Sequence, residues 1–176
     1  MRIIAGSLKG RRLTTPSWDG LRPTSDKMRE TLFNILQARV PGARVLDGYA
    51  GTGAVGIEAL SRGAAQVTFV ERDRRAVALI EANLAACGMT EGYTIESGDV
   101  ATVLDRSGAF DLIFLDPPYD IPSLDAALMA AARRVAPDGV IVLERATRRD
   151  VVVPDSLIRM RDVVSGDSTL TFLKPS

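Results

Sequence analysis

The pattern of apolar and polar positions along most of the chain predicts strands and helices that follow one another in alternation. Short apolar runs are followed by longer stretches whose apolar residues recur at helical spacing. The expected strands are 45–47, 66–71, 93–96, 110–115 and 140–143, and the expected helices are 55–62, 74–86, about 100–104 and 124–135. This alternation predicts an α/β fold with a doubly wound, mostly parallel sheet. A closing antiparallel pair is expected at 157–164 and 168–174.

The N-terminal part of the chain follows a different pattern. Residues 1–15 are expected to form a strand, a glycine-containing turn and a second strand, and residues 16–24 a loop. A helix follows, and Thr24, Ser25 or Asp26 can cap its start. Its apolar side chains share one face at helical spacing: Met28, Leu32, Ile35 and Leu36. The pattern predicts a small hairpin and an amphipathic helix that pack beside the sheet.

The tetrapeptide Asp116-Pro117-Pro118-Tyr119 follows directly after the apolar strand 110–115. Ligands of open parallel sheets bind beyond the carboxyl ends of the strands, so this segment lies where a substrate is expected. Two prolines stiffen the loop and remove two backbone donors, which leaves its carbonyls as acceptors. Asp116 and the Pro117 carbonyl would accept both hydrogens of an exocyclic amine, and Tyr119 would stack on its ring. The alternative is a plain Pro-Pro turn with Asp116 as a turn former.

The segment 47–56, here called the glycine loop, connects the first strand to its helix. Its spacing Gly51-x-Gly53-x-x-Gly56 satisfies the dinucleotide fingerprint, with Glu71 twenty residues beyond Gly51. Asp47 argues against a dinucleotide, because a pyrophosphate at this helix start would face a carboxylate. S-adenosylmethionine has no phosphate and carries positive charge. The acid therefore favours S-adenosylmethionine as the cofactor.

Two further acids lie where they could bind the nucleoside part of a cofactor. Glu71 ends the second strand and could accept both ribose hydroxyls; the alternative is a solvated acid at a strand end. Asp99 could accept the adenine amine while the Val100 N–H donates to the ring. Asp99 is equally a good N-cap for the helix that follows it, and one side chain can serve both purposes.

The composition excludes several classes of protein. The 176 residues contain no histidine, which rules out histidine-based general bases, metal ligands and triads. Cys87 is the single cysteine, so an intramolecular disulfide is impossible, and we expect a buried thiol in a reducing compartment. No apolar run reaches the ~18 residues of a membrane span, and the N-terminus does not resemble a signal peptide. We therefore expect a cytoplasmic protein without membrane contact. No helix carries an obvious apolar second face, so we expect a monomer.

The formal net charge of zero conceals a polarity. Residues 1–44 hold nine lysines and arginines against three acids, and residues 45–176 hold thirteen against nineteen. This asymmetry suggests an N-terminal surface for a polyanion. The alternative is that the basic side chains merely solvate an edge hairpin.

In combination, these motifs resemble class I S-adenosylmethionine-dependent methyltransferases that modify exocyclic amines. Segments 2–6, 9–13 and 21–36 narrow the resemblance to the small bacterial 16S ribosomal RNA (guanine-N2)-methyltransferases. It covers nearly the whole chain, and the stretch from Arg22 to Leu36 is its most specific element. Departures are modest: Gly48, Tyr49 and Thr52 vary the glycine loop, and the C-terminal pair matches only loosely. The resemblance implies a Rossmann-like, seven-stranded methyltransferase sheet.

The resemblance also assigns roles to residues. It implies a basic N-terminal appendage at 1–40 that binds RNA and a methyltransferase domain at 41–176 that binds S-adenosylmethionine. The catalytic residues would be Asp116, Pro117, Pro118 and Tyr119, and the cofactor would contact Asp47, Tyr49, Gly51, Gly53, Glu71, Arg72, Asp99 and Val100. Lys9, Arg11, Arg12, Arg22 and Arg29 would bind RNA phosphates, with no metal involved. The partner would be 16S rRNA, within the small subunit or an assembly intermediate.

Three other functions fit parts of the sequence. A DNA adenine-N6 methyltransferase shares the logic of residues 116–119, but this chain shows no additional target-recognition domain. A dinucleotide oxidoreductase accounts for the glycines, yet explains neither Asp47 nor the Pro-Pro loop. A non-catalytic RNA-binding assembly factor would not use the cofactor site, and the presence of all the acids expected for that site argues against this function.

Overall fold

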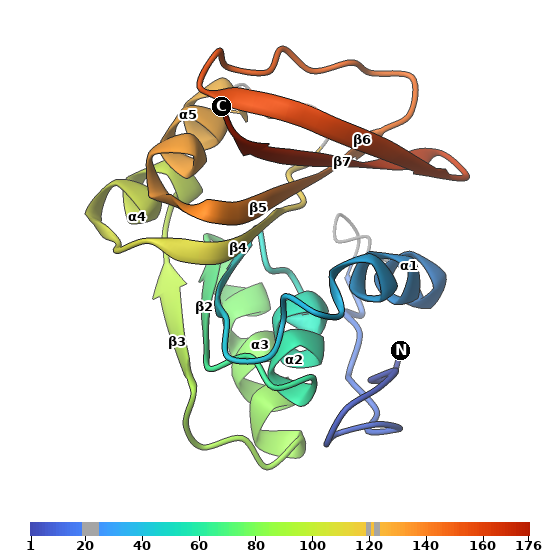
Figure 1. The fold of residues 1–176 in the computed structure, drawn as a ribbon. Helices are drawn as coiled ribbons and strands as arrows, with labels where there is room; N and C mark the ends of the chain where they lie inside the picture. Colours follow the sequence, from blue (N-terminus) through green and yellow to red (C-terminus); the bar gives the residue numbers. More distant parts are fainter. Residues whose placement is uncertain (19–24, 119–120, 122–123) are drawn as a thin grey trace.

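A single seven-stranded sheet forms the centre of the computed structural model (Figure 1), which describes residues 1–18, 25–118, 121 and 124–176. The strand order is β3-β2-β1-β4-β5-β7-β6. The strands are β1 (Arg44–Gly48), β2 (Gln66–Glu71), β3 (Tyr93–Ser97), β4 (Phe110–Leu115), β5 (Val135–Ala146), β6 (Leu157–Ser165) and β7 (Ser168–Pro175). Strands β1 to β5 pair in parallel, and β7 pairs antiparallel with β5 and β6. The predicted mostly parallel sheet is confirmed.

Helices cover both faces of this sheet, as predicted. The helices are α1 (Asp26–Leu36), α2 (Ala54–Ser61), α3 (Arg74–Ala86), α4 (Val100–Arg106) and α5 (Leu124–Arg134). One apolar cluster joins α1, α2 and α3 to one face of the sheet, and a second joins α4 and α5 to the other. Strand β1 shows why: Val45 belongs to the first cluster and Leu46 to the second, since successive side chains point to opposite faces.

Strand β5 begins earlier than the sequence pattern predicts. Helix α5 ends at Arg134, and Val135 already pairs with Phe110 of β4. The next pair is Leu112 with Val140, so residues 136–139 bulge out of the ladder rather than forming a separate turn. A side chain at Gly139 would lie 2.9 Å from the carbonyl oxygen of Asp111, so the bulge needs a glycine.

The N-terminal hairpin is less regular than expected. Residues 1–15 contain one isolated antiparallel bridge, between Arg2 and Arg12, in place of two strands. The backbone still folds back on itself, because Ile3 N donates to Arg11 O at 2.9 Å and Gly10 N donates to Ile3 O at 2.9 Å. Several other polar backbone groups here bond to the helices beside them, which explains why a long ladder does not form.

Helix α1 begins at the middle one of its three candidate caps. The Ser25 hydroxyl accepts a hydrogen bond from Met28 N at 3.1 Å. Its apolar face packs into the same cluster as β4, where the rings of Phe33 and Phe114 lie 5.9 Å apart. The division of the chain at residue 40 stays a prediction. Within the described part of the chain, no helix is long and apolar enough to cross a membrane.

Candidate active site

The polar residues singled out in the sequence lie along one edge of the sheet. Strands β1 and β4 are adjacent and parallel, and Gly48 pairs with Leu115 in register. The next residue, Asp116, donates its backbone N–H to Gly48 O at 3.3 Å. On the other side β1 pairs with β2, which ends at Glu71, and Glu71 is the register partner of Ser97 on β3. The carboxyl ends of four neighbouring strands therefore bring Asp47, Glu71 and Asp116 to the same edge.

The glycine loop uses left-handed backbone at its tightest points. Gly51 and Gly53 have φ values of 56° and 75°, and Tyr49 has a φ of 62°. Tyr49 is the one described residue other than glycine with a positive φ, a conformation that is costly for a bulky side chain. Strained backbone of this kind gathers at functional sites. Gly56 has a packing role instead, because a side chain there would lie 2.2 Å from the Phe69 ring.

Asp47 is a buried carboxyl group in this loop. It is 4% exposed, and its Oδ2 accepts a hydrogen bond from Gly56 N at 2.8 Å. The pKa of Asp47 is raised to about 7, mainly by burial; the hydrogen bond from Gly56 opposes this shift, and the nearby Glu71 carboxylate adds a smaller rise. A buried acid that is half ionised near neutral pH is poised for a cationic ligand, whose charge would draw the carboxylate form.

Glu71 holds the loop in place through backbone N–H groups. Its Oε2 accepts from Gly51 N at 3.0 Å, and its Oε1 accepts from Arg72 N at 2.8 Å and Asp73 N at 2.9 Å. The side chain is therefore bound to the loop and is not a merely solvated acid. Arg72 itself is exposed. Binding of ribose by Glu71 and contact of Arg72 with the cofactor stay predictions.

Asp99 caps helix α4, which was one of its two predicted roles. Its Oδ1 accepts from Thr102 N at 3.1 Å and from the Thr102 hydroxyl at 3.3 Å. The side chain is exposed at the same sheet edge, and Val100 after it is buried. Contact of Asp99 and Val100 with an adenine ring stays a prediction.

The Pro-Pro loop leaves β4 beside the glycine loop. Asp116 is half-buried, Pro117 is buried and Pro118 is exposed. The Pro118 carbonyl accepts from Ile121 N at 3.1 Å, so its direction is set by the chain that follows. The predicted stacking residue Tyr119 lies outside the described residues. The described part of the loop places a carboxylate and a stiff backbone next to the glycine loop.

The predicted RNA-binding residues divide into two groups. Lys9, Arg11 and Arg12 are exposed around the turn at residues 9–12, here called the basic turn. Gly10 within it has a φ of 84°. Phosphate contacts by these three residues stay a prediction, and Arg22 lies outside the described residues.

The RNA contact predicted for Arg29 is wrong. This residue lies one helical turn before the buried Phe33 and is itself 0% exposed. Its Nη2 donates to Arg2 O at 2.7 Å and to Asp26 Oδ1 at 2.8 Å, and burial lowers the pKa of the guanidinium. Arg29 connects α1 to residues 1–18, here called the N-terminal segment, through hydrogen bonds in the interior. No phosphate can reach it there.

Three buried polar residues that the sequence analysis missed hold the N-terminal segment to the domain. The Glu58 carboxylate accepts from Ile4 N at 2.8 Å and Ala5 N at 3.0 Å. The Ser61 hydroxyl accepts from Leu8 N at 2.9 Å, and the Asn83 amide bonds both polar backbone groups of Thr14. The available signal was an acid inside the apolar run 54–60, since a buried charge needs fixed partners.

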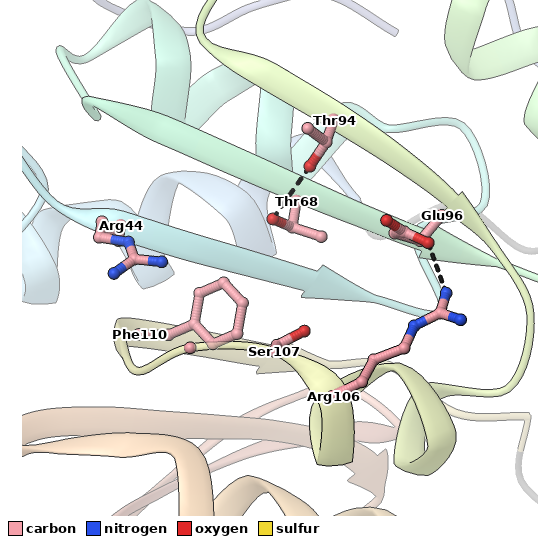
Figure 2. A pocket seen from close by; sticks show the side chains of 8 residues that line it. Arg44, Thr68, Thr94, Glu96, Arg106, Ser107 and Phe110 are labelled. Carbon is pink, nitrogen blue, oxygen red and sulfur yellow. Dashed lines mark hydrogen bonds and ion pairs between the residues drawn. The ribbon is translucent and has the colours of Figure 1, made fainter.

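A hollow lies on the sheet away from the candidate site (Figure 2). It has a volume of about 380 Å³ and is lined in part by Arg44, Thr68, Thr94, Glu96 and Arg106. Arg106 Nη2 lies 2.5 Å from Glu96 Oε2, and the two threonine hydroxyls are 3.2 Å apart. Arg44 begins β1 and Phe110 begins β4, so one end of this hollow lies at the amino ends of the two central strands, and it extends across β2 and β3 to Thr68 and Glu96.

Comparisons with known proteins agree with the geometry. The family model described as Conserved hypothetical protein 95 matches residues 1–174. Ribosomal RNA small subunit methyltransferase D of Haemophilus influenzae is 33% identical over 172 residues, or 94% of this chain and 89% of the relative. The protein of the same name from Escherichia coli is 40% identical over 119 residues, or 68% of this chain and 60% of the relative.

Solved structures share the fold over the full length. Escherichia coli yhhF superimposes with a TM-score of 0.87 at 32% identity, covering 100% of this chain and 98% of that one. The hypothetical protein TTHA0928 of Thermus thermophilus does so with a TM-score of 0.83 at 31% identity, covering 99% of each chain. The N-terminal segment is therefore included in the match.

Proposed function

The chain belongs to the family described as Conserved hypothetical protein 95, and we propose that it transfers a methyl group from S-adenosylmethionine to the N2 amine of a guanine in small-subunit (16S) ribosomal RNA. The observation that carries this proposal is the juxtaposition of the Asp47 loop with Asp116 and its Pro-Pro backbone at two adjacent strand ends. The names of the Haemophilus influenzae and Escherichia coli relatives support it.

The residues present fit S-adenosylmethionine better than a dinucleotide. Asp47 is a buried carboxylate that accepts the Gly56 N–H near the start of α2, where a pyrophosphate would otherwise sit. The sulfonium and ammonium groups of the cofactor suit this acid. Glu71 and Asp99 supply acceptors for the nucleoside, and the Val100 N–H supplies a donor. The bound cofactor would present an electrophilic methyl group to the neighbouring Pro-Pro loop.

Asp116 and the Pro117 carbonyl then make the target amine reactive. The guanine N2 lone pair is delocalised into the ring, so the free amine is a poor nucleophile. Two acceptors that hold both N–H bonds favour the pyramidal nitrogen, and the carboxylate stabilises positive charge that grows on it. The N–C bond forms as the S–CH3 bond breaks, which releases S-adenosylhomocysteine, and the surplus proton on nitrogen then passes to solvent. The absence of histidine is therefore no obstacle. Alignment of the amine contributes the rest of the acceleration.

The basic turn gives the substrate a second contact. Lys9, Arg11 and Arg12 are exposed on a segment that the helices hold rigidly, which suits contacts with phosphates. A guanine has to leave its stack to reach Asp116, so a loop or unpaired base is the expected target. Tyr119 would stack on the base, and Arg22 would add a phosphate contact. We expect a monomer that acts on the small subunit or an assembly intermediate.

The test is a transfer assay with methyl-labelled S-adenosylmethionine. Unmodified small ribosomal subunits, naked 16S RNA and DNA are offered in parallel, and the labelled nucleoside is identified after digestion. N2-methylguanosine from subunits or RNA is the expected product. Label in N6-methyladenine from DNA would keep the chemistry of Asp116 but overturn the substrate. No label in any of the three would overturn the proposal.

A further inference from the structure

Asn83 connects two parts of the molecule that are distant in sequence. It lies in α3, and its side chain is 0% exposed. Its Oδ1 accepts from Thr14 N at 2.8 Å, and its Nδ2 donates to Thr14 O at 3.1 Å and to Thr52 O at 2.9 Å. These three bonds use both the acceptor and the donors of the amide. One side chain therefore joins the N-terminal segment to the glycine loop.

The Thr14 end of this connection belongs to the segment that carries the basic turn. Thr14 follows Arg12 by two residues, and both of its polar backbone groups are bonded to Asn83. Further along, the Arg75 guanidinium lies over the Trp18 ring at 5.2 Å. Residues 14–18 therefore run along α3 from Asn83 toward the start of that helix, which is the end that faces the carboxyl edge of the sheet.

The Thr52 end belongs to the candidate cofactor site. Thr52 is 3% exposed and stands between Gly51 and Gly53, whose left-handed backbone shapes the loop. A side chain added at Gly53 would lie 3.3 Å from Ile80 of α3, so the loop is packed tightly against the helix that carries Asn83. Any movement of Thr52 O away from the helix lengthens its bond to Nδ2 and disturbs the amide that also holds Thr14.

From this geometry, and resting on the proposed function, we infer that Asn83 is a positioning residue that couples RNA binding at the basic turn to cofactor binding at the glycine loop. All three amide bonds are made in this structure, so a ligand that orders either end stabilises this arrangement against states in which one of the bonds is open, and each ligand thereby strengthens the binding of the other. Such coupling is reciprocal and is commonly ~5-fold or more in affinity. Asn83 itself touches neither ligand.

The experiment measures a coupling factor, not activity alone. The dissociation constant for unmodified 16S RNA or small subunits, whichever the wild type methylates, is measured with and without saturating S-adenosylhomocysteine. S-adenosylhomocysteine, the product of methyl transfer from the cofactor, cannot donate a methyl group, so RNA binding is measured at equilibrium without turnover. For the wild type we expect RNA binding to tighten ~5-fold with the product bound, and for Asn83→Ala we expect a ratio of about one.

Ser61→Ala is the matched control. Ser61 holds the same N-terminal segment through Leu8 N and Ala5 O, but it makes no contact with the glycine loop among the hydrogen bonds of the described residues. We expect this variant to weaken RNA binding with and without the product while the ratio stays as in the wild type. Loss of the ratio in Ser61→Ala would mean that coupling follows general loosening, and it would overturn the role of Asn83.

Thermal unfolding and the transfer assay distinguish a folding defect and a failed proposed function from a failed coupling role. If thermal unfolding shows that Asn83→Ala does not fold, Asn83→Asp replaces it, because an acid keeps an acceptor for Thr14 N. A wild-type ratio of one, or an unchanged ratio in the Asn83 variant, would overturn the inference and leave the proposed methyl transfer intact. A wild type that methylates neither RNA nor subunits would overturn both, and the transfer assay identifies that case by itself.

Discussion

The carboxyl edge of the sheet and the N-terminal segment are built in different ways, although both belong to the candidate site. At the sheet edge, backbone topology brings Asp47, Glu71 and Asp116 together, because each lies at or just beside the carboxyl end of a parallel strand. In the segment, no ladder longer than one bridge positions the basic turn. Buried side chains of α2 and α3 do so instead, through Glu58, Ser61 and Asn83.

This difference shows where each region is vulnerable. The sheet edge is supported by strands with many hydrogen bonds, so the half-buried side chain of Asp116 can be removed with little effect on the fold. The N-terminal segment depends on a few buried polar bonds, and each loss leaves backbone N–H groups without partners. Substitutions at the edge should therefore change chemistry, and substitutions at the anchors should change stability and RNA binding.

Asp116→Ala should produce the largest effect on the chemistry of the sheet edge. We expect methyl transfer to fall by a factor on the order of 10²–10³ or more, because the acceptor that stabilises the charged amine is lost. S-adenosylhomocysteine affinity, measured by calorimetry, should stay close to that of the wild type. Asp155→Ala, an exposed acid outside the site, is the control. Loss of cofactor affinity without loss of turnover would contradict the assigned role.

Glu58→Ala should produce the largest effect on stability in the anchors. The Glu58 side chain is 0% exposed, and its removal leaves Ile4 N, Ala5 N and Arg62 Nε without this acceptor. We expect the free energy of unfolding in urea to fall by about 3 kcal/mol, as for other broken buried pairs. Glu81→Ala on the exposed side of α3 should change it by less than ~0.5 kcal/mol. Equal effects would contradict the anchoring role.

Asp47 should make stability depend on pH. Its pKa of about 7 in the folded protein lies above the ordinary value of 3.8, so folding favours the protonated form. The unfolded state releases this proton first, and the contribution to stability is therefore lost as the pH rises from ~4 through ~7. Asp47→Asn should remove that loss, so its unfolding free energy should rise relative to that of the wild type between pH ~4 and pH ~7. A constant difference across this range would contradict the shift.

The basic turn should produce the smallest and most salt-dependent effect. Arg11→Ala and Arg12→Ala should each weaken RNA binding and reduce the slope of log affinity against log salt by ~0.7, as expected for one phosphate contact on a single strand. The measurement is RNA binding over a series of KCl concentrations. Arg106→Ala, in the hollow shown in Figure 2 and paired with Glu96, should leave the slope unchanged. If the slope is the same in the wild type, Arg11→Ala and Arg12→Ala, these arginines do not bind RNA phosphates.

Prediction from the sequence succeeded where local pattern and topology carry the information. The alternating pattern predicted the sheet and its helices, and the expected meeting of Asp47, Glu71 and Asp116 follows from parallel strands alone. It was less accurate where neighbours decide: Val135 pairs with Phe110 and starts β5 early, and residues 1–15 bond several of their backbone groups to helices instead of to each other.

The amino-acid sequence by itself determined the order of strands and helices, the glycine loop, and the acids at the strand ends, because periodicity and strand-end position are local properties. Only the tertiary structure decided which charged side chains are buried, which are exposed and how their pKa values are shifted. Arg29 and Lys9 are both cations near the N-terminus, yet one is buried against Arg2 O and the other is exposed. Likewise the buried surroundings of Asp47 raise its pKa. Burial and hydrogen-bond partners come from residues distant in sequence, and they set what each charge can do.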